Sequence, residues 1–367
     1  MFDGFLTLPV LAVGAFFAVS YFVNPETIII EEISVPLYLE YRGFNNEVAT
    51  GLLTEEVAKI AHAATTNRGT MTAELTAQGR SVEALSDWFG LSKPIRTTQV
   101  ALGFLPYTFS GEIIEKGGND LMLSIRGRSP AYRKFSIDEH GRIDDVEGLF
   151  HSAALRLMQE IDPYLVAVYH FRKEGAASDY PLTKAAIDFC LVHADRQQLP
   201  WVYALWGHVL HNEGRYEQAI VKFRQALTLD PTFPRPMMRW GQTLAVQGRH
   251  EEAIGRYRKT LEIEPDYPEA LVAWAESLIA LGQHVEARRK YEEAVSMAPT
   301  FPRILVAYGT FLAQNGDKVG GAEYLRRAVE LEGGENKGNA IALRKVQREL
   351  DPVLEQTRPM AEGMPLR

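Results

Sequence analysis

PRPMMRWGQTLAVQGRHEEAIGRYRKTLEIEPDY, residues 234–267, is followed at 268–301 by PEALVAWAESLIALGQHVEARRKYEEAVSMAPTF. A shift of 34 residues therefore superimposes the C-terminal half of the chain on itself, which is a period typical of stacked helical hairpins. An aromatic residue followed by a small one recurs at this spacing, at Trp206-Gly207, Trp240-Gly241, Trp274-Ala275 and Tyr308-Gly309. This pattern therefore predicts that each repeat forms two helices joined by a tight turn.

The remaining repeated positions explain how such helices pack. Glycine recurs where the turn should lie, at Gly214, Gly248, Gly282 and Gly316, because it permits a left-handed backbone. The second helix of each repeat carries a small residue, at Ala219, Ala253, Ala287 and Gly321, and a large one four residues later, at Phe223, Tyr257, Tyr291 and Leu325. The small residue lets two helix backbones approach, and the large one fills the space beside it.

These positions constitute the signature of the tetratricopeptide repeat, which the chain resembles over four units in residues 200–335. The resemblance implies an all-α solenoid, in which neighbouring units hide each other's apolar faces. We expect a degenerate helical repeat at 163–199 and a capping helix and tail at 336–367. The signature residues themselves are structural, and none of them is predicted to be a functional site.

In tetratricopeptide-repeat proteins the first helices of successive units line a concave groove that holds a segment of a partner protein. Carried over to this chain, the resemblance places eight candidate partner-binding residues in the groove: Trp201, His208, Arg235, Arg239, Gln242, Glu269, Glu276 and Arg303. Arg235 and Arg239 lie one helical turn apart and form the best candidate anion-binding pair, since guanidinium groups match carboxylates in shape. The alternative is that the two arginines are solvated and pair with Glu269 or Glu276.

Some members of the family clamp a C-terminal carboxylate with asparagines and lysines on neighbouring units. In this chain Ala204 and Leu205 occupy such places. The resemblance therefore implies a protein or peptide partner without specifying that kind of clamp.

Residues 5–23 carry no charged side chain. At about 1.5 Å per residue, this stretch is long enough for a helix to cross the hydrocarbon core of a bilayer. We therefore predict one N-terminal transmembrane helix within residues 1–24. A cleaved signal peptide remains the alternative, although the first four residues contain no Lys or Arg. The nearest basic residue after the helix is Arg42, which favours an extracytoplasmic location for the remainder of this single-pass membrane protein.

The pattern of apolar residues and turns in residues 27–162 predicts an α+β domain. The expected order is a strand at 28–35, a helix beginning near Asn45, strands at 71–75, 100–105, 108–114, 121–125 and 132–137, and an amphipathic helix at 146–161, with a short helix at 82–89. Gly117-Gly118-Asn119 predicts a hairpin turn, and His140-Gly141 a second turn. This order, with Phe109-Ser110-Gly111-Glu112 opening the hairpin, resembles the small TolB-N and CsgG-type domains of bacterial envelope proteins. That resemblance implies assembly or recognition in an envelope.

Composition excludes several function classes. The net charge of −8 argues against nucleic acid as a partner. Cys190 is the only cysteine, so disulfides and cysteine-based metal sites are excluded. His208 and His211 are close enough on one helix to share a metal, but no third ligand has suitable spacing. Phosphate-binding, dinucleotide-binding and hydrolase motifs are absent from the sequence, so we predict no metal, no cofactor and no catalytic residue.

The sequence thus predicts an N-terminal transmembrane helix, an α+β middle domain and a tetratricopeptide-repeat solenoid. The predicted function is a membrane-anchored adaptor or scaffold that binds a partner protein, in a bacterial envelope assembly. Two alternatives remain: a signalling component that faces the cytoplasm, and a divergent enzyme with its site in the middle domain.

Overall fold

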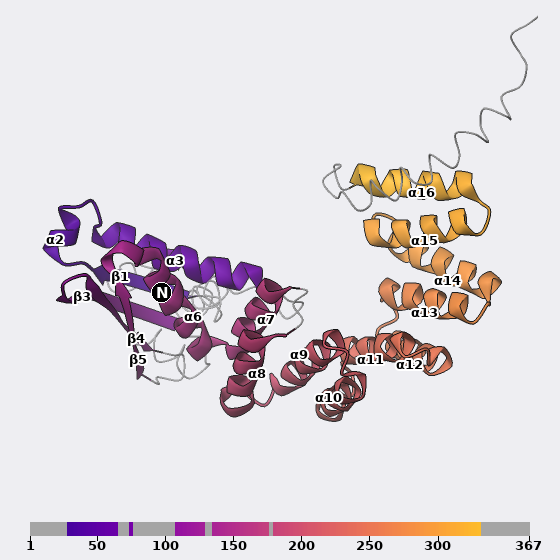
Figure 1. The fold of residues 1–367 in the computed structure, drawn as a ribbon, viewed down its shortest axis with the longest axis horizontal. Coiled ribbons are helices and arrows are strands. Elements are labelled where there is room, and N and C mark those ends of the chain that lie inside the picture. Colours follow the sequence, from indigo (N-terminus) through magenta and orange to yellow (C-terminus); the bar gives the residue numbers. More distant parts are fainter. Residues whose placement is uncertain (1–27, 65–72, 76–106, 129–133, 176–178, 332–367) are drawn as a thin grey trace, which may run out of the picture. The chain divides into compact units, whose positions relative to one another are not determined.

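The computed structural model describes residues 28–64, 73–75, 107–128, 134–175 and 179–331. The chain divides into two compact units, Met1–Gln198 and Leu199–Arg367, whose elements are shown in Figure 1. The predicted transmembrane helix at 1–24, the helix at 82–89, the strand at 100–105 and the capping helix and tail at 336–367 lie outside the described residues. Among the helices that are described, none is long and apolar enough to cross a membrane.

In the first unit the described strands form one sheet in the order β2-β1-β3-β4-β5. Their bounds are Ile28–Ser34 (β1), Ala73–Leu75 (β2), Tyr107–Gly117 (β3), Asp120–Arg128 (β4) and Lys134–Arg142 (β5). β1 runs parallel to β2 and β3, whereas β3, β4 and β5 form an antiparallel meander. The predicted hairpin between β3 and β4 is confirmed, with positive φ angles at Gly117 and Gly118.

The predicted turn at His140-Gly141 is wrong, because both residues belong to β5 and pair with Met122 and Leu121 of β4. Gly141 is instead required by packing. A Cβ atom at this position would lie 2.8 Å from the Cβ atom of Leu149. The glycine therefore marks a close approach between the strand and the following helix, not a turn.

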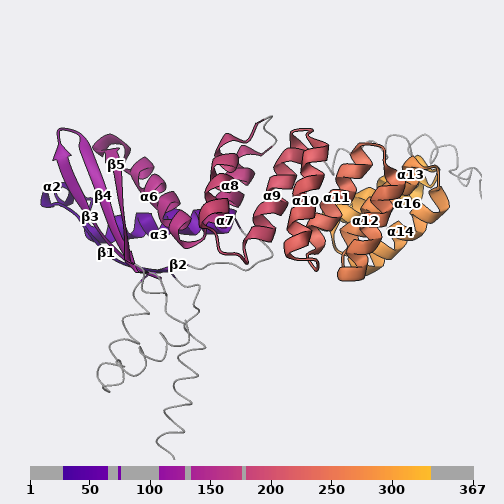
Figure 2. The ribbon, with the colours of Figure 1, turned by 90° about the horizontal axis from the view of Figure 1, so that it is seen from below.

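Helices pack on this sheet and continue beyond it. Their bounds are Leu37–Glu40 (α2), Asn46–Ala63 (α3), Val146–Ile161 (α6, after the short 3₁₀ turn η1, Ile143–Asp145), Pro163–Glu174 (α7) and Pro181–His193 (α8). α3 contacts β1 and α6, and α6 contacts β4 and β5, so both helices cover the same face (Figure 2). Asn45 caps α3 by accepting a hydrogen bond from the Val48 amide, as its position in the sequence predicts. α7 and α8 pack against each other at the place of the expected degenerate repeat.

A polar network joins α3, α6 and α7. Glu56 accepts from Lys59 and contacts Nδ1 of His151 at 2.7 Å, while Nε2 of His151 lies 3.4 Å from the Tyr169 hydroxyl. Burial by itself would raise the pKa of Glu56, but the hydrogen bonds from Lys59 and His151 outweigh it and hold this pKa below its ordinary value. The ionised carboxylate is therefore the form that stabilises the folded unit.

We expect Glu56→Gln to lower the free energy of unfolding by about 1–2 kcal/mol at neutral pH. Because the folded-state pKa is depressed, this contribution is present above the pKa of the unfolded chain and is lost as the pH falls through the folded-state pKa. Denaturant unfolding of both proteins over acidic to neutral pH measures it. Glu55→Gln is the matched control, because Glu55 also pairs with Lys59 but is 59% exposed. Equal effects of the two variants would contradict a role for the His151 contact.

The second unit consists, in its described part, of four antiparallel helix pairs. They are Leu199–Asn212 (α9) with Tyr216–Leu229 (α10), Pro234–Val246 (α11) with His250–Ile263 (α12), Pro268–Ala280 (α13) with His284–Met297 (α14), and Pro302–Gln314 (α15) with Lys318–Leu331 (α16). The pairs follow the period of the sequence, and the four turn glycines have φ angles between 74° and 95°. Figure 2 shows the pairs following one another along the chain. The solenoid prediction is confirmed for these helices.

The small residues lie where two helices of a pair meet. A Cβ atom on Gly241 would approach the ring of Tyr257 to 2.4 Å, and one on Gly207 would approach the ring of Phe223 to 2.5 Å. Ala253 is fully buried beside this contact. The repeat signature is thus a packing requirement: any side chain larger than the one present would force the two helices apart.

A cation lies over the tryptophan in each of the first three repeats. Nζ of Lys222 is 3.3 Å from the ring centre of Trp206, Cζ of Arg256 is 3.8 Å from that of Trp240, and Nζ of Lys290 is 4.4 Å from that of Trp274. In the fourth repeat two tyrosines, Tyr308 and Tyr324, contact each other at the same positions. These pairs tie the first helix of each repeat to the second.

Ala253→Leu should overpack the contact between α11 and α12 and lower the free energy of unfolding by about 1–3 kcal/mol. Thermal unfolding followed by circular dichroism measures the effect. Gly255→Ala on the same helix is the control: its Cβ atom meets nothing within 4 Å, so the better helix former should raise stability slightly. An unchanged transition in Ala253→Leu would mean that the repeat register is wrong.

Candidate partner-binding surface

The first helices of the four pairs lie beside one another. α11 contacts α9 and α13, and α13 in turn contacts α15. We call the surface formed by α9, α11, α13 and α15 the first-helix surface. All eight residues predicted to bind a partner lie on these four helices.

Three arginines form a basic cluster on this surface. Arg235 and Arg239 are half-buried on α11, and Arg303 is exposed on α15. Burial lowers the pKa of Arg239, and the nearby positive charges of Arg235 and Arg303 lower it further. The guanidinium nevertheless remains charged at physiological pH, as arginine does throughout proteins. We call Arg235, Arg239 and Arg303 the basic cluster.

Arg239 forms a hydrogen bond with a neutral group: its Nη1 donates to Oε1 of Gln242 at 3.1 Å. Within the described parts of the chain, no carboxylate forms an ion pair with Arg235 or Arg239. The alternative in which these arginines pair with Glu269 or Glu276 is therefore not realised in this structure. A half-buried cation without a counterion is costly, and a bound anion would offset that cost.

The two histidines of α9 face the basic cluster. Burial, followed by the charges of Arg239, His211 and Arg235, lowers the pKa of His208 to about 3, so this imidazole is neutral at physiological pH. His211 contacts the Thr243 hydroxyl through Nδ1 at 2.9 Å. Since that hydroxyl donates to the carbonyl of Arg239 at 2.8 Å, its oxygen accepts from the Nδ1–H of His211. In the described residues no group of three potential ligands could hold a metal.

The remaining predicted residues have different surroundings. The ring of Trp201 packs on that of Phe233 at 4.2 Å, within a cluster that includes the buried residues Ala204 and Ala226. Much of Trp201 thus contributes to packing between helices. Glu269 is exposed on α13, and its charge acts on Tyr267 next to the basic cluster.

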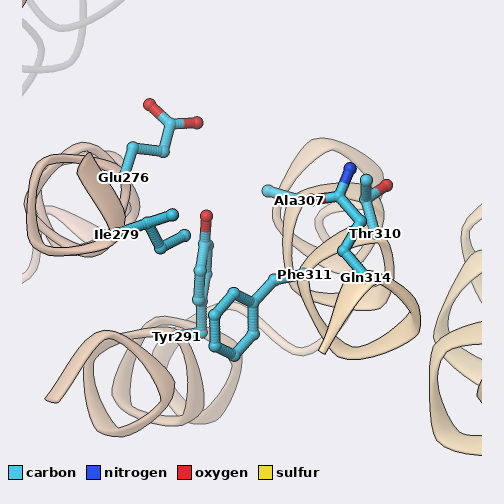
Figure 3. A pocket seen from close by; sticks show the side chains of 7 residues that line it. All are labelled: Glu276, Ile279, Tyr291, Ala307, Thr310, Phe311 and Gln314. Atoms are coloured by element: carbon cyan, nitrogen blue, oxygen red, sulfur yellow. The ribbon is translucent and has the colours of Figure 1, made fainter. Parts of the chain in front are cut away.

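Glu276 lines a cavity of about 330 Å³ between α13, α14 and α15. The other lining residues are Ile279, Tyr291, Ala307, Thr310, Phe311 and Gln314. Figure 3 shows the ring of Tyr291 beside that of Phe311, with its hydroxyl directed to the side on which Glu276 lies. Glu276 itself is exposed, but desolvation of its carboxylate raises its pKa, while the charge of Arg303 opposes that shift. We call this site the Glu276 pocket.

Among these lining residues, only Glu276 is one of the eight candidate partner-binding residues predicted from the sequence. A signal was nonetheless present in the repeats: the position of Arg239 is occupied one and two repeats later by Ala273 and Ala307. Loss of the long side chain leaves space beside the first helix. The aromatic residue at Phe311, where earlier repeats have Thr243 and Ser277, then provides an apolar wall.

Comparison with known families agrees with the repeat geometry. Residues 210–273 and 244–289 match one tetratricopeptide-repeat family model, and residues 272–336 match a second. Residues 210–336 are therefore tetratricopeptide repeats. No curated protein matches the chain at a significant level.

Several solved structures match part of the chain. The Cut9–Hcn1 hetero-tetramer of the APC/C matches with 15% identity and a TM-score of 0.45, over 55% of this chain and 40% of that one. The chain thus spans less than half the length of that protein. The pilF protein of Pseudomonas aeruginosa matches with 16% identity and a TM-score of 0.42, over 56% and 95% of the two chains. The first TPR of Spaghetti, solved with an HSP90 peptide, matches with 22% identity and a TM-score of 0.29, over 31% and 90%.

Proposed function

We propose that this chain, whose residues 210–336 are tetratricopeptide repeats, is a membrane-anchored adaptor that binds an acidic segment of a partner protein on its first-helix surface. Such repeats generally serve as protein-binding scaffolds and not as enzymes. The observation that carries the proposal is the basic cluster, in which Arg239 is half-buried without a carboxylate partner among the described residues.

The chemistry of the cluster supports an acidic ligand. Arg235 and Arg239 present two guanidinium groups one helical turn apart, and each can donate two parallel hydrogen bonds to a carboxylate. His208 next to them is neutral, so its imidazole neither attracts nor repels a bound anion through charge. Gln242 holds one amino group of Arg239 in place. A carboxylate of the partner would therefore find donors that are already oriented.

The membrane part of the proposal is supported by the sequence. The uncharged stretch at 5–23 has the length of a membrane-spanning helix. The absence of basic residues before Arg42 favours export of the rest of the chain. Together with the resemblance of residues 28–161 to envelope domains, these features support an adaptor in a bacterial envelope assembly, with its bulk outside the cytoplasm.

Replacement of both Arg235 and Arg239 by Ala should weaken capture of the partner at least tenfold, because each charge-assisted hydrogen bond contributes about 1.5–3 kcal/mol. Pull-down of partners from detergent-solubilised membranes, followed by titration of the partner that is identified, measures the loss. Thermal unfolding should be nearly unchanged, since neither side chain belongs to the buried core.

The matched control replaces Arg224 and Arg289 by Ala. Both are exposed on second helices and have no ion pair among the described residues. Arg256 is unsuitable as a control because it packs over Trp240. Equal losses from both double variants would show that the partner senses only bulk charge, and no loss from either would place the binding site elsewhere.

A reporter fused after Arg367 should behave as exported, because the N-terminal helix carries the rest of the chain across the membrane. Alkaline phosphatase fused there should be active, and green fluorescent protein should be dark. The opposite pair of results would place the repeats in the cytoplasm. A shorter mature protein by mass spectrometry would indicate a cleaved signal peptide instead of an anchor.

A further inference from the structure

The Glu276 pocket differs from the basic cluster in charge and in shape. Its walls are apolar where Ile279, Ala307 and Phe311 line it, and its polar groups come from Glu276, Tyr291, Thr310 and Gln314. Tyr291 and Phe311 are buried, with ring centres 5.1 Å apart, so their rings form a fixed wall. The pocket is therefore a partly aromatic cavity with a carboxylate beside it (Figure 3).

The carboxylate of Glu276 has no cation of its own. In the regions that the structure describes, it forms neither a hydrogen bond nor an ion pair. Arg303 acts on it through space but lies beyond ion-pair distance. Desolvation raises the pKa of the exposed Glu276 carboxylate and also that of the buried Tyr291 hydroxyl, on which the negative charge of Glu276 acts in addition. Both groups would gain from a ligand that donates hydrogen bonds and carries positive charge.

We propose that the Glu276 pocket binds a basic side chain, Lys or Arg, of the same partner segment whose acidic group contacts the basic cluster. The aliphatic stem would lie against Ile279, Ala307 and Phe311, and the cationic end would reach the Glu276 carboxylate. This division of one side chain into an apolar stem and a charged end is how Lys and Arg pack on other surfaces. The aromatic wall adds a favourable contact for the cation.

Other occupants fit less well. A purely apolar side chain would bury Glu276 and Thr310 without giving them hydrogen bonds, which carries a free-energy cost. An acidic side chain would be repelled by Glu276. The volume of about 330 Å³ is within the range of small-ligand sites and leaves room for a long side chain. The pocket therefore adds a second element of specificity to the proposed acidic ligand.

This inference rests on the proposed function, because it places one partner segment in both sites. The experiment therefore measures binding at each site separately. A phage-displayed library of random short peptides is selected against the full-length chain in detergent, as wild type and as Glu276→Gln. Wild type should enrich peptides that carry both an acidic and a basic residue at a fixed spacing. Glu276→Gln should keep the acidic residue and lose the basic one.

Glu269→Gln is the matched control, because Glu269 is an exposed carboxylate on the same helix that does not line the pocket. It should select the same peptides as wild type. For one enriched peptide, replacement of its basic residue by norleucine should weaken binding to wild type about tenfold, and binding to Glu276→Gln hardly at all. Exchange of Lys and Arg in that peptide shows which cation the pocket prefers. Ala307→Leu, which fills the pocket, should mimic Glu276→Gln if its thermal unfolding matches wild type.

Enrichment of acidic residues without a basic one, or identical selection by wild type and Glu276→Gln, would overturn this inference and leave the proposed function standing. Enrichment of a basic residue alone that depends on Glu276 would support the pocket and contradict the acidic ligand. If the double variant Arg235→Ala with Arg239→Ala selects the same peptides as wild type, that result would contradict only the proposed function. Retrieval of no peptide by wild type would overturn both.

Discussion

The close approach of two helices within each repeat is the constraint on which the second unit depends. Where Gly241 faces the ring of Tyr257, no space remains for even one additional carbon atom. The turn glycines serve the same geometry, since their positive φ angles let the second helix return directly alongside the first. A single pair encloses little apolar surface, and the cluster around Tyr257 accordingly includes Ala270 and Ala273 of the next pair. Neighbouring helix pairs in this unit therefore stabilise one another.

That constraint also separates structural positions from variable ones. Small residues and their large partners recur because packing admits little else, and the cations over Trp206, Trp240 and Trp274 recur because each covers an exposed part of an indole ring. Positions of the first-helix surface outside this signature are free to vary. There, one repeat position is Arg239, Ala273 and Ala307 in turn, and another is Gln242, Glu276 and Thr310. Variation at these two positions places Arg239 in the basic cluster and Glu276 in the pocket.

The same distinction explains what the sequence could predict. The repeat register and the hairpin at Gly117-Gly118 depend on local rules, and the structure confirms them. Gly141 misled the prediction because a glycine required by contact with Leu149 looks the same in sequence as a glycine required by a turn. The Glu276 pocket was missed because its lining comes from three helices, and only the folded repeats show that Tyr291 and Phe311 face the same space. The spacing of Arg235 and Arg239 in the sequence predicts that they lie on one face of a helix. Only the structure shows that neither pairs with a carboxylate among the described residues.

Arg303 links the two sites electrostatically. Its positive charge lowers the pKa of Arg239 and also opposes the rise in the pKa of Glu276, so both sites lie within its field. An acidic group bound beside Arg239 would compensate part of the charge of Arg303, and a cation entering the Glu276 pocket would then meet less repulsion. By thermodynamic reciprocity, a cation in the pocket would favour the acidic group to the same extent. A segment that carries both charges therefore fits this surface better than a segment that carries only one of them, because each charge reduces the electrostatic cost of binding the other.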